Sequence, residues 1–242
     1  MGSYQFRFQW RFLIATIVGI VLFINLGFWQ LNRGHAKEII IEKFQVRQNQ
    51  PALSLQQLLL KKDKNYYPVS LKGTFDNQHI FLLDNETQNG KVGFDVIMPF
   101  KIQGSDQYIL VNRGWVQAAA YRNQLPKIAT INKALSLVGH IVLPSEQPFL
   151  LKAQKLNYKE WPLVIQTIDI HLIEKIIGKP IYNFILQLAP NSSYAFIDNW
   201  QAVKLRPQKH YAYAFQWFTF AFTLLVIFIG LNVKKRDNES EN

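Results

Sequence analysis

The pattern of apolar and polar positions places two long uncharged runs near the ends of the chain. One run extends from Phe12 to Leu31 and the other from Tyr211 to Val233. At about 1.5 Å of rise per helical residue, each run can cross the roughly 30 Å hydrocarbon layer of a bilayer. The pattern predicts two transmembrane helices, with both termini on one side of a membrane and the middle of the chain on the other.

The first run follows basic residues, as the apolar core of a signal peptide does. It is longer than such a core, however, and it ends in Gly27-Phe-Trp-Gln, which offers no small-residue cleavage site. We therefore expect a retained anchor. The predicted organisation is a tail over residues 1–11, spans over 12–31 and 211–233, a domain over 32–210 and a tail over 234–242.

Between the spans the pattern changes its period. The first helix is expected to continue beyond the bilayer and to end before Pro51. Ser54 is a suitable N-cap for a short amphipathic helix over Ser54–Lys62. Apolar and polar residues then alternate over Tyr67–Phe75, which predicts a half-buried strand.

The rest of the central region predicts short strands separated by turns. The expected strands are His79–Leu83, Val92–Phe100, Gln107–Trp115, Ala134–Val142, Tyr182–Leu188 and Tyr194–Trp200. Asp84 and Glu86 are expected in the loop before the Asn89-Gly90 turn, and a helix over Ile168–Ile177 ends at Gly178. The fold class is α+β: a small antiparallel sheet or barrel with short helices, flanked by two transmembrane helices.

Composition excludes several classes of function. The chain has no cysteine and two methionines, so it lacks the sulfur ligands of a copper carrier. The net charge of +11 is scattered and lacks the basic patch of a nucleic-acid-binding protein, whereas lysines and arginines beside the spans suit anionic lipid headgroups. We find no nucleophile–base–acid set, no phosphate-binding loop and no histidine pair at ligand spacing, and expect no enzyme.

His210 stands where the second span begins, among aromatic residues. On a helix it shares a face with Tyr213 (or Ala214) and Trp217. One interpretation is an ordinary aromatic belt at the level of the headgroups. The other is a site where the imidazole binds the iron of an amphipathic macrocycle, with flat aromatic neighbours beside the ring.

Two further groups of residues, one on the first span and one in a central strand, suggest specific packing contacts. Asn25, Trp29 and Asn32 share one face of the first span, and we expect the two spans to pack together with Asn25 and Gln216 between them. In the strand Gln107–Trp115, Arg113 falls on the same side as Trp115. A structural cation–π contact between these side chains is expected, and an anion-binding role for Arg113 stays open.

Several motifs spread over the whole chain resemble the Surfeit-locus family of cytochrome oxidase assembly proteins. They are Leu26-Gly-Phe-Trp-Gln with Arg33 and Lys37, Gly73-Thr-Phe, Gly93 with Pro99, Val111-Asn-Arg-Gly-Trp, and His210 with Tyr213-Ala214 and Gln216-Trp217-Phe218. Two positions depart from the family pattern, since Ala36 replaces a frequent tryptophan and Glu86 replaces a common arginine. The second departure weakens any anion-binding role for its loop.

The resemblance implies an integral protein of the bacterial inner membrane, with cytoplasmic tails and a periplasmic domain. It implies help in maturing the haem–copper subunit of a terminal oxidase by supplying or inserting haem a, with oxidase subunit I and haem a synthase as partners. In that case His210 is the iron ligand, with Tyr213 and Trp217 beside it. The alternative is a membrane-anchored scaffold that binds no haem. The family motifs also mark these residues as structural or partner-facing: Trp29, Gln30, Arg33, Arg113, Gly114 and Trp115.

Overall fold

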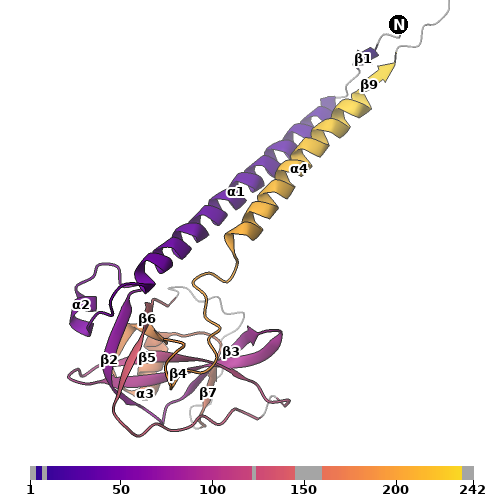
Figure 1. Ribbon diagram of the computed structural model, residues 1–242. Helices are drawn as coiled ribbons and strands as arrows, with labels where there is room; N and C mark the ends of the chain where they lie inside the picture. Colours follow the sequence, from indigo (N-terminus) through magenta and orange to yellow (C-terminus); the bar gives the residue numbers. More distant parts are fainter. Residues whose placement is uncertain (1–3, 7–9, 122–123, 145–159, 236–242) are drawn as a thin grey trace, which may run out of the picture. The chain divides into compact units, whose positions relative to one another are not determined.

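The computed structural model describes residues 4–6, 10–121, 124–144 and 160–235 (Figure 1). The chain divides into two units, one made of residues 1–42 and 202–242 and the other of residues 43–201. The expected C-terminal tail falls mostly outside the described residues. Each unit is described by itself.

The first unit is a pair of antiparallel helices, α1 (Trp10–Gln48) and α4 (Pro207–Asn232), which lie side by side (Figure 1). Both are long and apolar enough to cross a membrane. Their apolar side chains are largely exposed, for example Phe12 at 62% and Phe222 at 65%, so neither is the core helix of a soluble domain. Short strands β1 (Tyr4–Phe6) and β9 (Val233–Lys235) pair antiparallel beside the helix ends.

The helices pack through glycines and aromatic rings rather than through Asn25 and Gln216. A Cβ atom added at Gly27 would lie 2.5 Å from the ring of Phe218, and one added at Gly34 would lie 2.5 Å from the ring of Tyr211. Asn25 and Gln216 are exposed, so the prediction that they lie between the spans is wrong. Glycine suits positions 27 and 34 because, without a side chain, it lets an aromatic ring of α4 approach the backbone of α1.

The second unit begins with a short helix and a strand that the sequence predicted. Helix α2 (Leu55–Leu59) is shorter than expected, and Ser54 and Gln57 form a capping box at its start. Strand β2 (Pro68–Phe75) follows. Its burial alternates as predicted, because Val69, Leu71 and Phe75 point into the core.

Strands β3 (Phe81–Gln88) and β4 (Lys91–Ile102) form a hairpin around Asn89 and Gly90, whose φ angles of 50° and 76° suit a two-residue turn. Asp84 and Glu86 belong to β3, beside a register shift between Leu83 and Glu86. Their expected place in a loop is therefore wrong.

The remaining elements are β5 (Tyr108–Gln117), β6 (Leu135–Val142), β7 (Leu163–Ile165), α3 (Ile170–Ile177) and β8 (Ile181–Leu188). Five strands close into a barrel in the order β2–β6–β8–β5–β4, with β4 pairing back to β2. The sequence predicted an antiparallel sheet or barrel; the structure has a barrel, and its pairs β5–β8 and β3–β7 are parallel rather than antiparallel. A crossover that contains α3 leads the chain back to β8 for the parallel pairing with β5.

Two apolar clusters explain why β4 and β5 are almost continuously buried. One cluster fills the barrel with residues from all five strands, including Val69, Met98 and Leu186. The other covers Ile97 and Leu110 on the opposite face with β7 and the apolar side of α3. Buried on both faces, these strands lose the alternation that an exposed sheet shows.

The predicted strand Tyr194–Trp200 does not form. Its only ladder contact is an isolated bridge between Ile197 and Trp115. The segment packs as an irregular strap beside β5, with backbone hydrogen bonds from Phe196 to Arg113 and from Trp115 to Ile197. Its aromatic side chains pack against the barrel unit. The alternation of apolar and polar residues is the same for such a segment as for a strand, so the sequence pattern could not tell the two apart.

Candidate functional site

His210 lies in the first turn of α4 and is only 8% exposed. Pro207 begins this helix, and its fixed φ suits the first helical position. The Nδ1 atom of His210 lies 2.7 Å from Oε1 of Gln30 on α1. With the amide oxygen toward the ring, Nδ1 carries the proton and donates it to Gln30. The carboxamide thus fixes both the tautomer and the orientation of the imidazole.

Among the described residues, none forms a hydrogen bond with the second ring nitrogen of His210. Nε2 is a buried atom with less than 1 Å² of exposed surface. Because Nδ1 holds the proton, Nε2 presents a lone pair, which is the form of imidazole that binds iron. The donor chemistry therefore fits the haem implied by the resemblance, while access to Nε2 requires neighbouring side chains to move. The described residues contain no group of three metal-ligating side chains.

The aromatic neighbours expected around His210 are only partly brought together. Ala214 is buried on the face of α4 that meets α1, whereas Tyr213 is 49% exposed. Trp217 stacks on Phe23 with ring centroids 5.7 Å apart. Because Trp217 is seven residues from His210, it lies about 10 Å further along the helix.

Trp29 and Arg33 do not belong to the His210 site. Trp29 is 54% exposed on α1, and Arg33 is exposed as well. Gln30, between them in sequence, is the only one of the three that contacts His210. Of these three motif residues at the end of the first span, Gln30 is thus hydrogen-bonded to α4, whereas Trp29 and Arg33 are exposed.

Arg113 is buried inside the second unit, and its expected contact with Trp115 is wrong. Its guanidinium lies 4.5 Å from the centroid of the Phe196 ring and 5.4 Å from that of Phe75. Its Nε donates to the carbonyl oxygen of Tyr194 at 2.9 Å. Burial lowers the pKa of Arg113 to about 10, which leaves it protonated at neutral pH.

A bulge at Gly114 separates Arg113 from Trp115. Gly114 has a φ angle of 103°, and a Cβ atom there would lie 2.7 Å from the carbonyl oxygen of Ile197. The ladder between β4 and β5 shifts register at this point, which places the two side chains in different surroundings. Trp115 donates its indole N–H to the carbonyl oxygen of Glu86 at 3.1 Å. These contacts give Arg113, Gly114 and Trp115 a structural role around the strap.

A second enclosed histidine was not identified from the sequence. His140 on β6 lies 4.5 Å from Trp200 and 5.1 Å from Phe44, measured between ring centroids. Burial lowers its pKa to about 4, so the imidazole is neutral at physiological pH. A lone histidine in an alternating strand gives no signal of this aromatic surrounding, because the rings come from distant segments.

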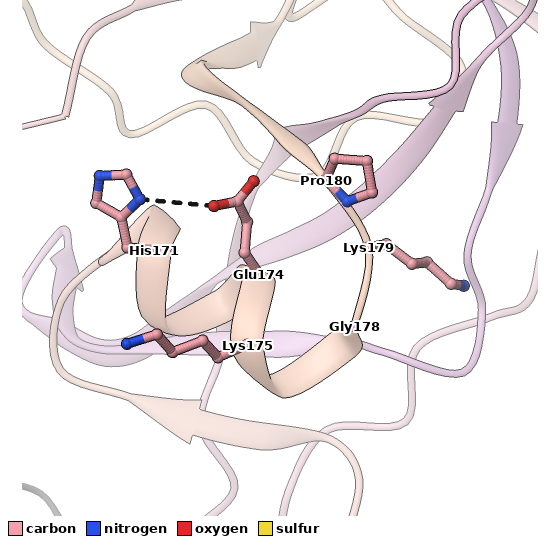
Figure 2. A pocket seen from close by; sticks show the side chains of 6 residues that line it. All are labelled: His171, Glu174, Lys175, Gly178, Lys179 and Pro180. Atoms are coloured by element: carbon pink, nitrogen blue, oxygen red, sulfur yellow. Dashed lines mark ion pairs between the residues drawn. The ribbon is translucent and has the colours of Figure 1, made fainter.

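A surface pocket of about 330 Å³ lies at the end of α3 (Figure 2). Its lining consists of His171, Glu174, Lys175, Gly178, Lys179 and Pro180. Figure 2 shows His171 and Glu174 directed toward each other, with Nδ1 and Oε2 3.5 Å apart. Glu174 also accepts the backbone N–H of Ile181 at 2.7 Å, which ties α3 to β8. None of the predicted site residues is among these lining residues.

These features define a class of protein: a five-stranded barrel domain accompanied by two helices that fit a membrane anchor, with a histidine held by an amide between them. The sequence model of the SURF1 family matches residues 17–222. The chain therefore belongs to the SURF1 family, which is known generally for cytochrome oxidase assembly factors.

The chain is similar to SURF1-like proteins of three Rickettsia species. It is 28% identical to that of Rickettsia felis, 27% to that of Rickettsia bellii and 28% to that of Rickettsia prowazekii. The alignments cover 89%, 89% and 90% of this chain, and 94%, 88% and 88% of the relatives. The likeness thus includes both helices and the barrel.

Proposed function

We propose that this protein is a non-enzymatic membrane assembly factor that aids the delivery or insertion of haem a into the catalytic subunit of a haem–copper oxidase. Family membership supports the link to oxidase assembly. The observation that carries the haem step is the buried, unpartnered Nε2 of His210, whose ring Gln30 holds through Nδ1. An oriented imidazole with a free lone pair is a suitable axial ligand.

The residues of the helix pair have distinct parts in this proposal. His210 is the proposed protein ligand, and Gln30 orients its ring by accepting the Nδ1–H, which places the lone pair of the neutral imidazole on Nε2. A bound haem would supply an iron atom for the lone pair of Nε2, and His210 would thereby hold the macrocycle at the helix pair. Tyr213 at 49% exposure offers an aromatic edge that a bound ring could reach, while Trp217 shapes the seam further along α4.

The location proposed is the bacterial inner membrane, with both tails cytoplasmic and the barrel domain periplasmic. The two membrane-length helices support this arrangement, because they run antiparallel and bracket the domain. The partners are oxidase subunit I, haem a synthase and the lipid bilayer. Neither nucleic acid nor copper is a proposed ligand, since the chain has no cysteine and no continuous basic patch.

The second candidate is a scaffold that stabilises an oxidase assembly intermediate without haem. The observation in its favour is the burial of His210, whose Nε2 exposes less than 1 Å². In that case the hydrogen bond to Gln30 joins α1 and α4 and has no further role. A buried polar pair of this kind can specify how two apolar helices pack.

The two candidates are separated by spectroscopy on the full-length protein purified from cells that make haem a. We expect a haem absorption band in the wild type, its loss in His210→Ala, and about 10- to 100-fold weaker haem affinity in Gln30→Leu. His171→Ala removes a histidine whose side chain is 81% exposed and serves as the matched control.

A colourless wild-type protein that still co-purifies with oxidase subunits would contradict haem binding and support the scaffold. Co-purification that is unchanged in His210→Ala would support the same conclusion. Loss of both the band and the oxidase subunits in His210→Ala, with normal membrane insertion, would link the histidine to assembly.

A further inference from the structure

The face of α1 opposite α4 carries polar residues at regular spacing. Gly27 and Gly34 pack against α4. Asn25 and Asn32 each precede one of these glycines by two residues, which is about 200° around the helix. Both asparagines are exposed in the described structure. Asn25 and Asn32 therefore lie on the side of α1 away from the partner helix that the chain itself supplies.

An amide on the outer face of a membrane span needs a partner. The Nδ2 atom of Asn25 donates to the carbonyl oxygen of Val21 at 2.7 Å, which uses one of its two N–H groups. The amide oxygen and the other N–H remain to be satisfied, and hydrocarbon offers neither a donor nor an acceptor. Exposure of such a group to lipid is unfavourable, whereas contact with another helix removes the penalty.

The spacing of this face is that of a two-helix seam. Val18, Asn25 and Asn32 are seven residues apart, and Val21 and Phe28 fill the intermediate positions of the same heptad. We name these five residues the Asn25 stripe. Val18, Val21 and Phe28 are 61%, 52% and 58% exposed. Phe28 also meets α4, with its ring centroid 5.5 Å from that of Phe218. Most of the stripe is nevertheless left uncovered by the described residues.

We propose that the Asn25 stripe binds the same stripe of a second copy of this chain, in a parallel dimer. Two copies inserted with the same topology run parallel, so each stripe residue meets its own counterpart at equal depth. A carboxamide is both donor and acceptor, and two Asn25 side chains can satisfy each other across the two-fold axis. This inference goes beyond oxidase assembly and does not depend on haem.

The chain contains no cysteine, which makes disulfide cross-linking a clean test. The full-length variants Val18→Cys and Val21→Cys are reconstituted separately in liposomes at low protein-to-lipid ratio and oxidised. Phe222→Cys, at a 65% exposed position of α4, is the control. We expect dimers from the two stripe variants, because paired positions bring Cα atoms to about 6 Å, which suits a disulfide. We expect monomer from Phe222→Cys.

A second measurement examines the amide itself. Dimerisation of labelled full-length protein in liposomes is followed by energy transfer. Asn25→Leu is expected to weaken association about 3- to 30-fold, as loss of an interhelical hydrogen bond does, while Asn25→Gln retains it. Asn25→Leu makes the span more apolar, so a failure to insert is not expected.

Equal cross-linking of Val21→Cys and Phe222→Cys would overturn the proposal, because it would indicate random collision. Unchanged association of Asn25→Leu would also overturn it. If Val21→Cys in native membranes cross-links only to a chain of different mass, the stripe binds another protein and the dimer is wrong.

Discussion

Gly114 shows how a single backbone conformation arranges several buried side chains of the barrel. Its φ angle of 103° lies in a region that side chains rarely adopt, and the Ile197 carbonyl occupies the space where a Cβ atom would be. The bulge directs Arg113 between the rings of Phe75 and Phe196 and lets Trp115 reach Glu86. The strap is thereby joined to β5.

Gly114→Ala is expected to lower the free energy of unfolding by about 2–4 kcal/mol, because backbone strain and the close Ile197 carbonyl add together. Gly104→Ala is the matched control. Gly104 has a φ angle of 79° but nothing within 4 Å of its Cβ position. Its alanine variant therefore measures backbone strain alone, and we expect a loss of unfolding free energy of about 1–2 kcal/mol. Denaturant unfolding of the full-length protein in detergent measures both. Equal losses in the two variants would contradict the close approach to Ile197.

The candidate site shows what could and could not be predicted at this scale. The sequence singled out His210 for its place among aromatic residues, and Gln30 as part of a motif at the end of the other span. Their hydrogen bond joins residues 180 positions apart, so no local pattern could reveal it. Arg113 was recognised as unusual, but its partners were predicted wrongly because a bulge changes the alternation of a strand.

At the scale of elements, the helix pair depends on complementary shapes. Gly27 and Gly34 are seven residues apart on α1, and Phe218 and Tyr211 are seven apart on α4, so two matching contacts form along the antiparallel pair. The spacing is visible in the sequence. Which residue faces which glycine is not, because it depends on the relative rotation and translation of the helices.

Gly27→Leu is expected to separate α1 from α4 by about 1–2 Å, since the new side chain cannot share space with the Phe218 ring. Spin labels at Ile17→Cys and Val226→Cys, both exposed positions, report the distance by pulsed electron resonance. Dilution with unlabelled protein removes signals between copies. Gly230→Leu is the control, because its Cβ position has nothing within 4 Å. An unchanged distance distribution in Gly27→Leu would argue against this packing.

Most elements of the barrel were predicted because their signals are local. The two positive φ angles at Asn89 and Gly90, the capping box at Ser54 and the left-handed Gly178 all act within a few residues. The errors arise where long-range packing decides. Tyr194–Trp200 has the composition of a strand, yet its backbone is held by one bridge to β5 and its rings are used for packing.

At the scale of the whole molecule, two antiparallel helices long enough to cross a membrane predict that both termini lie on one side of it. Cysteines added singly at each terminus, and Leu60→Cys at an 87% exposed position of the barrel unit, are tested with a membrane-impermeant maleimide. In intact spheroplasts we expect labelling of Leu60→Cys alone, and labelling of the termini only after the membrane is permeabilised. Labelling of one terminus in intact spheroplasts would contradict the arrangement.

The sequence by itself determined the two apolar helices, most strands and turns, a sheet or barrel, and the family, while the closure of the barrel came from the structure. These properties depend on the hydrophobic period, on turn residues and on motifs, and each of these signals involves residues close together in the sequence. Only the tertiary structure decided that Gln30 holds His210, that glycines rather than Asn25 and Gln216 lie between the helices, and that Arg113 meets Phe196. Each of these contacts joins distant segments whose rotation and register follow from packing the whole molecule at once.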